Sequence, residues 1–195
     1  MNKTILSVFL SMIVLSQLTS CETHYKEVGL DKLELRDSLW YENKSNELFT
    51  GRYLENYETG ELKSMVTIEN GKVNGKAESY YKNGAKAAEI NYRNGVFHGK
   101  SDEWFEDGQL STKATFCNGE LDGYSEKFFE NGLYDGYSYY RMGELDSLFR
   151  FFPSGKRKSE LKVFDLDNST LKEWDSTGIL IFQITQIDGE YVDGN

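Results

Sequence analysis

The sequence contains few of the residues from which disulfides, metal sites and nucleophilic centres are built. It has two cysteines, Cys21 and Cys117, and two histidines, His24 and His98, in 195 residues. Once Cys21 is assigned to the modification described below, Cys117 has no partner for an intramolecular disulfide, so stability must come from ordinary packing. A histidine-based metal site would need both histidines, which lie far apart in the sequence.

The chain also lacks an apolar run long enough to cross a bilayer, and it lacks excess positive charge. A membrane-spanning helix needs ~20 apolar residues, whereas the apolar stretch here runs only from about Ile5 to Leu18. The formal net charge is −10. Because an acidic chain is repelled by nucleic acid phosphates and by anionic lipids, we expect no nucleic-acid partner and membrane attachment only through a lipid anchor.

The N-terminal segment has the features of a secretory signal. One basic residue, Lys3, precedes the apolar stretch, which leads into Leu18-Thr19-Ser20-Cys21. These four residues resemble a bacterial lipobox, in which the cysteine is lipidated and becomes the first mature residue; an ordinary signal peptide with a chance cysteine is the alternative. We predict a signal peptide at residues 1–20, lipidation at Cys21 and a location in the bacterial cell envelope. Removal of residues 1–20 would leave 21 basic and 32 acidic residues, a charge of −11.

Three glycine series with a period of 24 residues organise the rest of the chain. They are Gly51, Gly75, Gly99 and Gly123; Gly60, Gly84, Gly108 and Gly132; and Gly71, Gly95, Gly119 and Gly143. Self-similarity at such a period is typical of repeat architectures. We predict one repeat domain over residues 39–195, with about six repeats and degenerate ends. Residues 21–38 do not follow the period, and we predict a tether between membrane and array; a short cap that folds back is the open alternative.

Each repeat has the pattern of a β-hairpin. Apolar and polar residues alternate through 66–69 and 90–93, as in half-buried strands. Asn-Gly, which readily adopts the two positive φ angles of a type I′ turn, occurs at Asn83-Gly84, Asn94-Gly95, Asn118-Gly119 and Asn131-Gly132. Glycine at this density disfavours helix. The sequence therefore predicts an all-β fold, an elongated, twisted antiparallel meander of stacked β-hairpins with one hairpin per 24 residues.

Two of these units resemble the repeats of a known family. They are Tyr80-Tyr81-Lys82-Asn83-Gly84 with Asn94-Gly95-Val96-Phe97-His98-Gly99, and Trp104-Phe105-Glu106-Asp107-Gly108 with Asn118-Gly119-Glu120-Leu121-Asp122-Gly123. They resemble the MORN-repeat-variant family, and the resemblance extends over about residues 39–194. It implies an elongated sheet with one hairpin per repeat. Bacterial members are often labelled antitoxins of toxin–antitoxin systems, so the resemblance also implies an inhibitor as an alternative function.

No residue pattern indicates catalysis, a metal site or a cofactor. His98 occupies a repeat position whose other residues favour turns, which indicates a structural role. That position also holds Asn74, Asp122 and Asp146. Cys117 falls at a polar strand position, and we expect no histidine near it to act as a base. The segment Asp165-Leu166-Asp167-Asn168 lacks the glycine and the distal glutamate of a calcium loop. We predict a protein that is not an enzyme and needs no cofactor.

Adjacent aromatic residues recur once per repeat and are the candidate binding residues. The first column contains Trp40, Tyr80, Trp104, Phe128 and Phe151, and the second contains Tyr41, Tyr81, Phe105, Phe129 and Phe152. Because neighbouring strand residues point to opposite faces, we expect one column to pack and the other to form an exposed stripe. Exposed apolar stripes often mark interaction surfaces, and we take the first column as the candidate binding stripe.

Together these features predict a non-catalytic envelope lipoprotein whose repeat array binds another protein. The acidic charge favours a basic partner, and the open end of the sheet at 189–195 offers an edge to a partner strand. Two alternatives stay open. One is an antitoxin or immunity-like inhibitor that occludes a toxin, and the other is glycan or peptidoglycan binding, with Tyr80 and Trp104 stacking on sugar rings.

Overall fold

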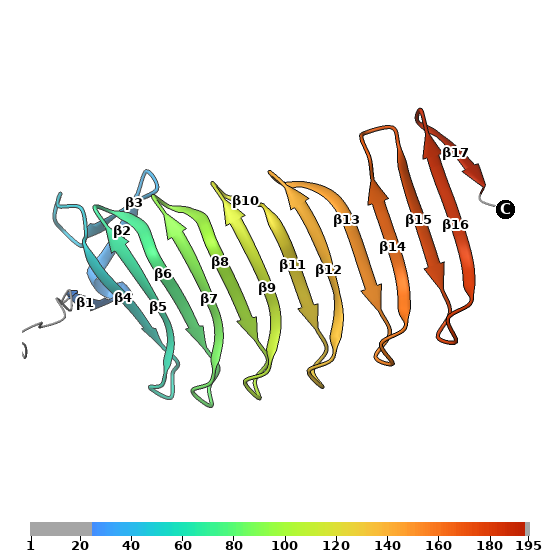
Figure 1. Cartoon of the computed structure of the whole chain (residues 1–195). Helices are drawn as coiled ribbons and strands as arrows, with labels where there is room; N and C mark the ends of the chain where they lie inside the picture. The colour runs from blue at the N-terminus through green and yellow to red at the C-terminus, as the bar shows by residue number, and fades with distance from the viewer. Residues whose placement is uncertain (1–24, 194–195) are drawn as a thin grey trace, which may run out of the picture.

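The protein, described by a computed structural model over residues 25–193, is a single open β-sheet with a small cap at one end (Figure 1). Fifteen strands form this sheet, and consecutive strands pair with each other along almost its whole length. The sheet does not close into a barrel. The predicted all-β meander of stacked hairpins is therefore confirmed. The predicted signal peptide and Cys21 lie outside the described residues.

The array contains most of the strands. They are β4 (Gly51–Asn56), β5 (Leu62–Glu69), β6 (Lys72–Tyr80), β7 (Lys86–Arg93), β8 (Val96–Trp104), β9 (Leu110–Cys117), β10 (Glu120–Leu121), β11 (Gly123–Phe128), β12 (Tyr134–Arg141), β13 (Glu144–Phe151), β14 (Arg157–Val163), β15 (Ser169–Trp174), β16 (Leu180–Ile187) and β17 (Glu190–Asp193). Consecutive strands of this series pair antiparallel, except that β10 and β11 both pair with β9 and not with each other. The strand order thus follows the chain order.

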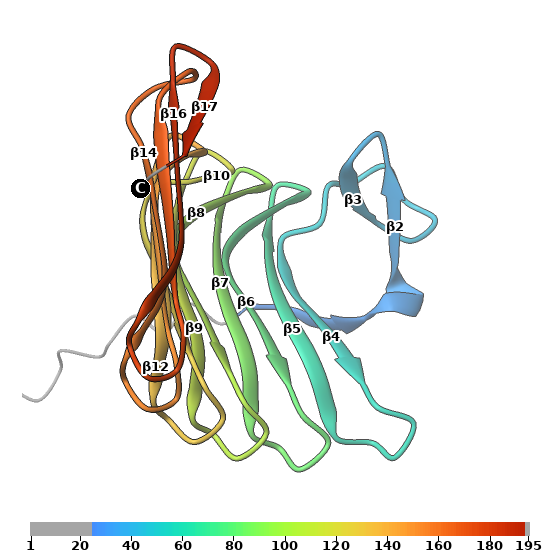
Figure 2. The ribbon, with the colours of Figure 1, turned by 90° about the vertical axis from the view of Figure 1, so that its right-hand side faces the viewer.

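The N-terminal residues form the cap. It consists of β1 (Glu27–Gly29), the 3₁₀ turn η1 (Leu30–Lys32), β2 (Leu33–Arg36) and β3 (Leu39–Glu42). Strand β1 pairs in parallel with the outer edge of β4, whereas β2 and β3 form a separate two-stranded sheet. Figure 2 shows this small sheet facing one side of the array. The sequence was compatible with either a tether or a folded-back cap for this segment. Residues 27–36 form the folded-back cap.

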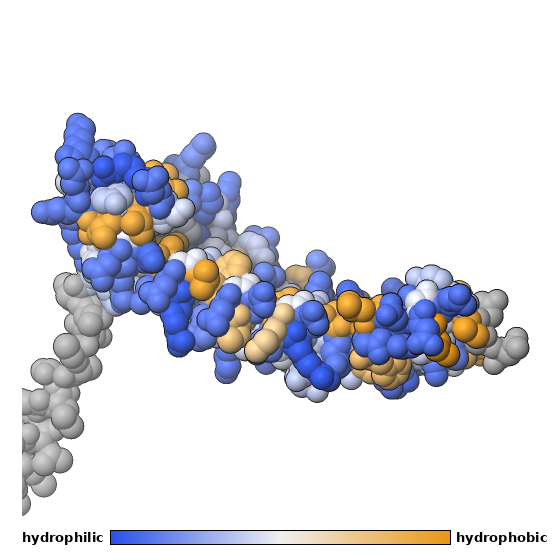
Figure 3. All heavy atoms as spheres, turned by 90° about the horizontal axis from the view of Figure 1, so that it is seen from above, coloured by the Kyte–Doolittle hydropathy of each residue, from blue (hydrophilic) through white to orange (hydrophobic). Residues whose placement is uncertain are grey.

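The buried apolar residues of the described chain lie together under this cap. Phe49, Ile68 and Leu33 have exposed fractions of 0%, 1% and 7%, and Trp40 and Tyr53 pack against them. We call the face of the array that contacts the cap, and that carries Tyr53 and Ile68, the cap face; the opposite side is the open face. Seen from above, the molecule is thick at the cap and thins to a slab (Figure 3).

A longer loop at residues 164–168 joins β14 to β15 at the upper edge of Figure 1, and two-residue turns close the other hairpins there. They are Asn70-Gly71, Asn94-Gly95, Asn118-Gly119, Met142-Gly143 and Asp188-Gly189, and both residues of each turn have positive φ. This is the backbone of a type I′ turn. The prediction from Asn-Gly is confirmed for residues 94–95 and 118–119.

Wider loops close the hairpins at the lower edge, and here the type I′ prediction is wrong. In the loop after β6, Gly84 has a φ of 84°, whereas Asn83 is not among the residues with positive φ. The Gly84 N–H donates to the Tyr81 carbonyl (2.9 Å), and the Asn83 side chain accepts the N–H of Ala85 (2.8 Å). Such a side-chain bond favours a glycine-bulge loop, in which only the glycine needs positive φ. Asn131-Gly132 follows the same pattern.

Hydrogen bonds from one repeat to the next hold both edges of the array. At the upper edge, the N–H of Gly95 donates to the carbonyl of Val73, and that of Gly119 to the carbonyl of Phe97, both at 2.8 Å. At the lower edge, the Tyr81 hydroxyl donates to the carbonyl of Trp104, also at 2.8 Å. The hairpin of β6 and β7 is therefore attached to the next hairpin at both ends as well as along its strands.

A side chain accepts the N–H of the first turn residue in four of the five two-residue turns. The pairs are Asn70 with Thr50, Asn94 with Asn74, Met142 with Asp122, and Asp188 with Asn168, each separated by 20 residues. His98 stands at the corresponding position for Asn118. Its Nδ1 is buried and has no hydrogen-bond partner within the described residues. Turn-favouring residues thus recur at this position because their side-chain oxygen accepts the N–H of the next turn. The buried Nδ1 of His98 makes no such hydrogen bond.

We predict that His98→Asn stabilises the protein. Asparagine at this position accepts the N–H of Asn118, as Asn74 accepts that of Asn94, and it removes a buried nitrogen that has no partner. The free energy of unfolding should rise by about 0.5–1.5 kcal/mol, the usual net value of one hydrogen bond. Urea unfolding measures this change.

The control is Lys100→Asn, at an exposed position of the same strand. Its free energy of unfolding should stay within about 0.5 kcal/mol of the parent. A His98→Asn variant no more stable than this control would contradict the prediction.

Candidate binding face

Four of the five predicted stripe residues lie together along the lower edge of the open face. Tyr80, Trp104, Phe128 and Phe151 are the last residues of β6, β8, β11 and β13, and all four are half-buried. Each lies two positions after a residue of the open face, as Tyr80 lies two positions after Glu78, and therefore points to the same face. Trp174, the last residue of β15, continues the column. The sequence analysis did not include Trp174 in the stripe. Its position in the degenerate last repeat was the signal that could have identified it.

Trp40 does not join these residues. Its ring stacks on Tyr53, with centroids 6.4 Å apart and planes at 14°, on the cap face. The cause is that β3 pairs with β2 and not with β4. The incomplete first repeat therefore folds over the sheet and does not extend it, so Trp40 belongs to the small core.

The second aromatic column stands in the lower loops and not on a strand. Tyr81, Phe105, Phe129 and Phe152 each directly follow the last residue of a strand. Their backbone N–H groups donate across the loop, for example from Tyr81 to the Ala85 carbonyl (2.8 Å). Side chains alternate between the two faces only within a strand. The sequence analysis assumed that the two columns lie on opposite faces of the same strands, and this assumption is wrong because the second column lies beyond the strand ends.

A cluster of aromatic rings covers the open face between β11 and β13. We call Tyr124, Phe128, Tyr134, Tyr137, Tyr139, Phe149 and Phe151 the aromatic cluster. Its centroid distances run from 4.7 Å for Tyr137 and Phe149 to 6.4 Å for Tyr134 and Tyr137, and each ring contacts at least one other. Tyr124 is 60% exposed. The sequence analysis missed five of these residues because they lie outside the aromatic pairs; the alternation of Tyr137 and Tyr139 was the available signal.

Tyr134 lies at the centre of the cluster and keeps its proton. Burial raises the pKa of Tyr134 to about 12, and the nearby charge of Glu126 acts in the same direction. The Tyr134 hydroxyl donates to Oε1 of Glu126 (3.3 Å). The phenol of Tyr134 is therefore a neutral hydrogen-bond donor at physiological pH.

Grooves with mixed charge flank the cluster on both sides. One, of about 390 Å³, is lined by Tyr124 together with Lys100, Asp102, Lys113, Ala114, Thr115 and Glu126. The other, of about 340 Å³, is lined by Phe149 together with Arg141, Asp146, Ser147, Lys162, Val163 and Phe164. Beyond it, the guanidinium of Arg157 lies 5.9 Å from the Phe149 ring centre and 5.2 Å from that of Trp174. Such distances allow cation–π attraction.

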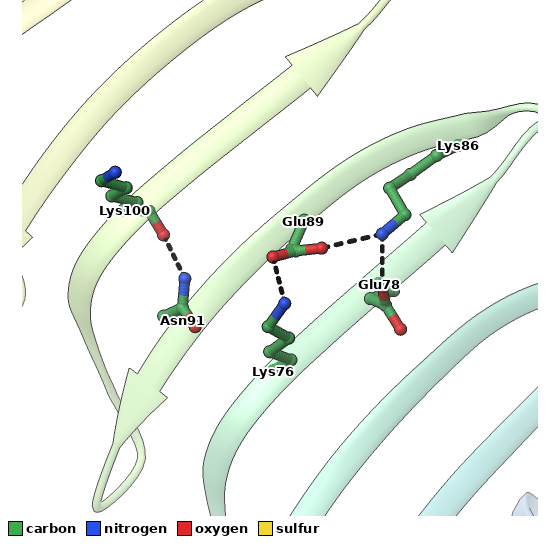
Figure 4. Close-up of polar contacts among 6 residues, drawn as sticks. All are labelled: Lys76, Glu78, Lys86, Glu89, Asn91 and Lys100. Atoms are coloured by element: carbon green, nitrogen blue, oxygen red, sulfur yellow. Dashed lines mark hydrogen bonds and ion pairs between the residues drawn. The ribbon is translucent and has the colours of Figure 1, made fainter.

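Nearer the cap, the same face carries a ladder of ion pairs (Figure 4). Glu89 on β7 accepts from Lys76 (2.6 Å) and Lys86 (2.7 Å), and Lys86 also pairs with Glu78. The bonds from Lys76 and then Lys86 lower the pKa of Glu89 to about 2. The bonds to Glu78 and Glu89 raise the pKa of Lys86. The charged side chains in this part of the open face are thus already paired with one another.

The remaining candidate residues form no recognisable site. Cys117 is half-buried. Strand β8, which carries His98, pairs with strand β9, which carries Cys117, and Gly99 lies opposite Phe116. No hydrogen bond between the two side chains is found in the described chain. Within residues 25–193, no group of three or more His, Cys, Asp and Glu side chains is placed to hold a metal. The same residues include no helix long and apolar enough to cross a membrane.

Comparison with known proteins identifies the central hairpins. Residues 73–94 and 97–118 match the MORN repeat variant family. The first match spans the hairpin of β6 and β7, and the second that of β8 and β9. No curated protein matched the chain.

The ion-pair ladder predicts a specific dependence of stability on pH. Since the folded-state pKa of Glu89 lies below its usual value of 4.5, its contribution is fully present above that value and is lost as the pH falls toward about 2. We expect the melting temperature of the parent protein to fall more steeply between about pH 5 and 2 than that of Glu89→Gln.

Thermal melts at intervals over this pH range measure the difference. The control is Glu106→Gln in an exposed loop position, which should keep the slope of the parent. Parallel curves for the parent and Glu89→Gln would contradict the role assigned to the ladder.

Proposed function

We propose that this chain, whose central hairpins are MORN repeat variants, is a non-catalytic scaffold that binds another protein through the aromatic cluster of its open face. Repeats of this family commonly take part in protein or membrane interactions. The observation that carries the proposal is the cluster itself. Its connected rings lie on a face that no element of the described chain covers, and its outermost ring, Tyr124, is 60% exposed.

The composition of this face is that of a protein interface. Tyrosine, tryptophan and arginine supply most binding hot spots. Here Arg157 lies near both Trp174 (5.2 Å) and Phe149 (5.9 Å), and Phe149 stacks on Tyr137. Tyrosine combines a large apolar ring with a hydroxyl that can bond at the rim. The grooves beside the cluster contribute charges of both signs, which suits the polar rim of an interface. The net charge of −10 would attract a basic partner over longer distances.

We further propose that the array is displayed on the bacterial cell envelope by lipid on Cys21. The support is the segment Leu18-Thr19-Ser20-Cys21 behind an apolar stretch. Cys21 precedes the start of β1 at Glu27 by six residues, which span at most about 20 Å. A lipid there holds the cap end close to the membrane and directs the rest of the slab to a partner.

Cells fed an alkyne fatty acid test the anchor. Label should attach to the parent protein and to Cys117→Ala, and it should be absent from Cys21→Ala. Cys117→Ala is the matched control because it removes the other cysteine of the chain. Label on Cys21→Ala, or its absence from the parent, would refute the anchor.

Alanine substitution in the cluster tests the binding surface. A photo-reactive residue placed at Met142, which is 75% exposed in the turn that joins β12 to β13, should crosslink to the partner in cells. With that partner purified, Tyr124→Ala and Tyr139→Ala should weaken binding by about tenfold or more, as at hot spots. Calorimetry measures the change in affinity.

The control for these variants is Tyr191→Ala, which removes an exposed tyrosine (72%) from β17, away from the cluster. Its affinity should equal that of the parent. Equal affinities for all variants would show that the partner binds outside the cluster. Recovery of a glycan as the ligand would favour the alternative in which aromatic side chains stack on sugar rings.

A further inference from the structure

A group of basic side chains lies on the open face beside the aromatic cluster, on β14 and β15. In the register of the strands, Glu160 pairs with Phe149 on one side and with Lys172 on the other. Lys162 lies two positions after Glu160 and therefore points to the same face. The guanidinium of Arg157 lies near the Phe149 ring. We call Arg157, Lys162 and Lys172 the basic patch.

A buried carboxylate holds two of these cations in place. Glu160 is only 8% exposed. Its Oε2 accepts a hydrogen bond from Arg157 (2.6 Å), and its Oε1 pairs with Lys162 (2.8 Å). The side chains of Arg157 and Lys162 are themselves 50% and 52% exposed. Both cations are thus fixed on their buried side and open to a ligand on the other.

The basic patch is positive although the chain as a whole is acidic. Three cations against the one carboxylate of Glu160 leave a local charge of +2, whereas the whole chain has −10. The ion-pair ladder nearer the cap, with two lysines and two glutamates, is neutral. Since salt screens charges beyond a Debye length of about 10 Å, the nearest charges dominate once a ligand is in contact. This part of the face therefore selects negative groups.

A groove connects the basic patch to the aromatic cluster. It has a volume of about 190 Å³ and is lined by Glu160, Lys162, Phe164, Thr170 and Lys172. Lys162 and Phe164 also line the groove beside Phe149. Phe149 and Lys172 are two strands apart in one cross-strand row, a distance of about 10 Å. An extended peptide covers this distance in about three residues.

We infer that the partner segment on this face is acidic, with an aspartate or glutamate about three positions from an apolar or aromatic residue. The inference rests on the proposed function, because the apolar residue contacts the aromatic cluster. The planar guanidinium of Arg157 suits a carboxylate, and Lys162 and Lys172 add point charges beside it. A partner that is basic as a whole is compatible with such a segment, because the net charge of the chain acts before contact. An anionic membrane fits this surface poorly, since it would also meet the rest of a chain of charge −10.

Selection from a phage-displayed library of random peptides tests the inference. The immobilised bait is residues 22–195, which contain every described element. The selected peptides should be enriched in aspartate and glutamate close to apolar or aromatic residues. A selection that enriches no peptide, or that enriches peptides without acidic residues, overturns the inference.

Variants that remove one positive charge then locate the bound peptide. Lys172→Gln should weaken binding of a selected peptide by about fivefold and Arg157→Gln by about tenfold, because hydrogen bonds between charged groups are the strong ones. The matched control is Lys127→Gln, which removes an exposed lysine from the cap face of β11 and should bind like the parent. Fluorescence anisotropy measures these affinities. The same peptide with its acidic residues replaced by their amides should bind the parent and Lys172→Gln equally.

Each outcome separates the basic patch from the aromatic cluster. Lys172 makes neither of the ion pairs of Glu160, so Lys172→Gln keeps the test valid if circular dichroism shows that Arg157→Gln fails to fold. Equal affinities for Lys172→Gln and Lys127→Gln overturn the inference. A peptide that binds Tyr139→Ala like the parent but Lys172→Gln weakly contradicts the proposed function alone.

Vesicles test a lipid surface as the other occupant of the basic patch. Vesicles of phosphatidylcholine and phosphatidylglycerol should not bind residues 22–195. Binding to these vesicles that is lost in Lys172→Gln would assign the basic patch to lipid and overturn the inference.

Discussion

The fold depends on hydrogen bonding between consecutive hairpins, because little else is buried. Globular domains usually bury a hydrophobic core between two layers. Here the buried apolar residues of the described chain are Leu33, Phe49 and Ile68, all at the cap. Beyond β6, the backbone ladders hold the sheet together, and the bonds between turns of successive repeats reinforce them. Each half-buried side chain is shielded mainly by its cross-strand neighbours.

The same backbone positions carry different chemistry along the open face. Glu89, Lys113 and Tyr137 occupy equivalent positions, since they pair with Glu78, Asp102 and Glu126 respectively. Near the cap the position belongs to an ion-pair ladder, whose charges neutralise one another. Two repeats later it carries a ring of the aromatic cluster. A regular scaffold thus confines recognition to one region through substitution of side chains, without any change of backbone.

The sequence predicted the fold well and the candidate surface in part, for identifiable reasons. Period-two alternation and Asn-Gly turns such as Asn94-Gly95 are local signals, and the sheet follows from them. The positions of Trp40 and of residues 27–36 depend on which strand pairs with β3. No local sequence pattern determines this pairing. The cluster around Tyr137 was missed because its residues meet only through the register of β11 to β13.

The agreement between strand order and chain order bears on how the molecule reaches its structure. All-β domains usually fold slowly because their strand pairs join residues that are distant in the sequence, and each such contact carries a large loop-closure cost. In this sheet nearly every strand pairs with the strand that precedes it. The loops to be closed are therefore a few residues long, and each completed hairpin is a template for the next. The protein has the strands of a slow-folding class and the sequence locality of a fast-folding one.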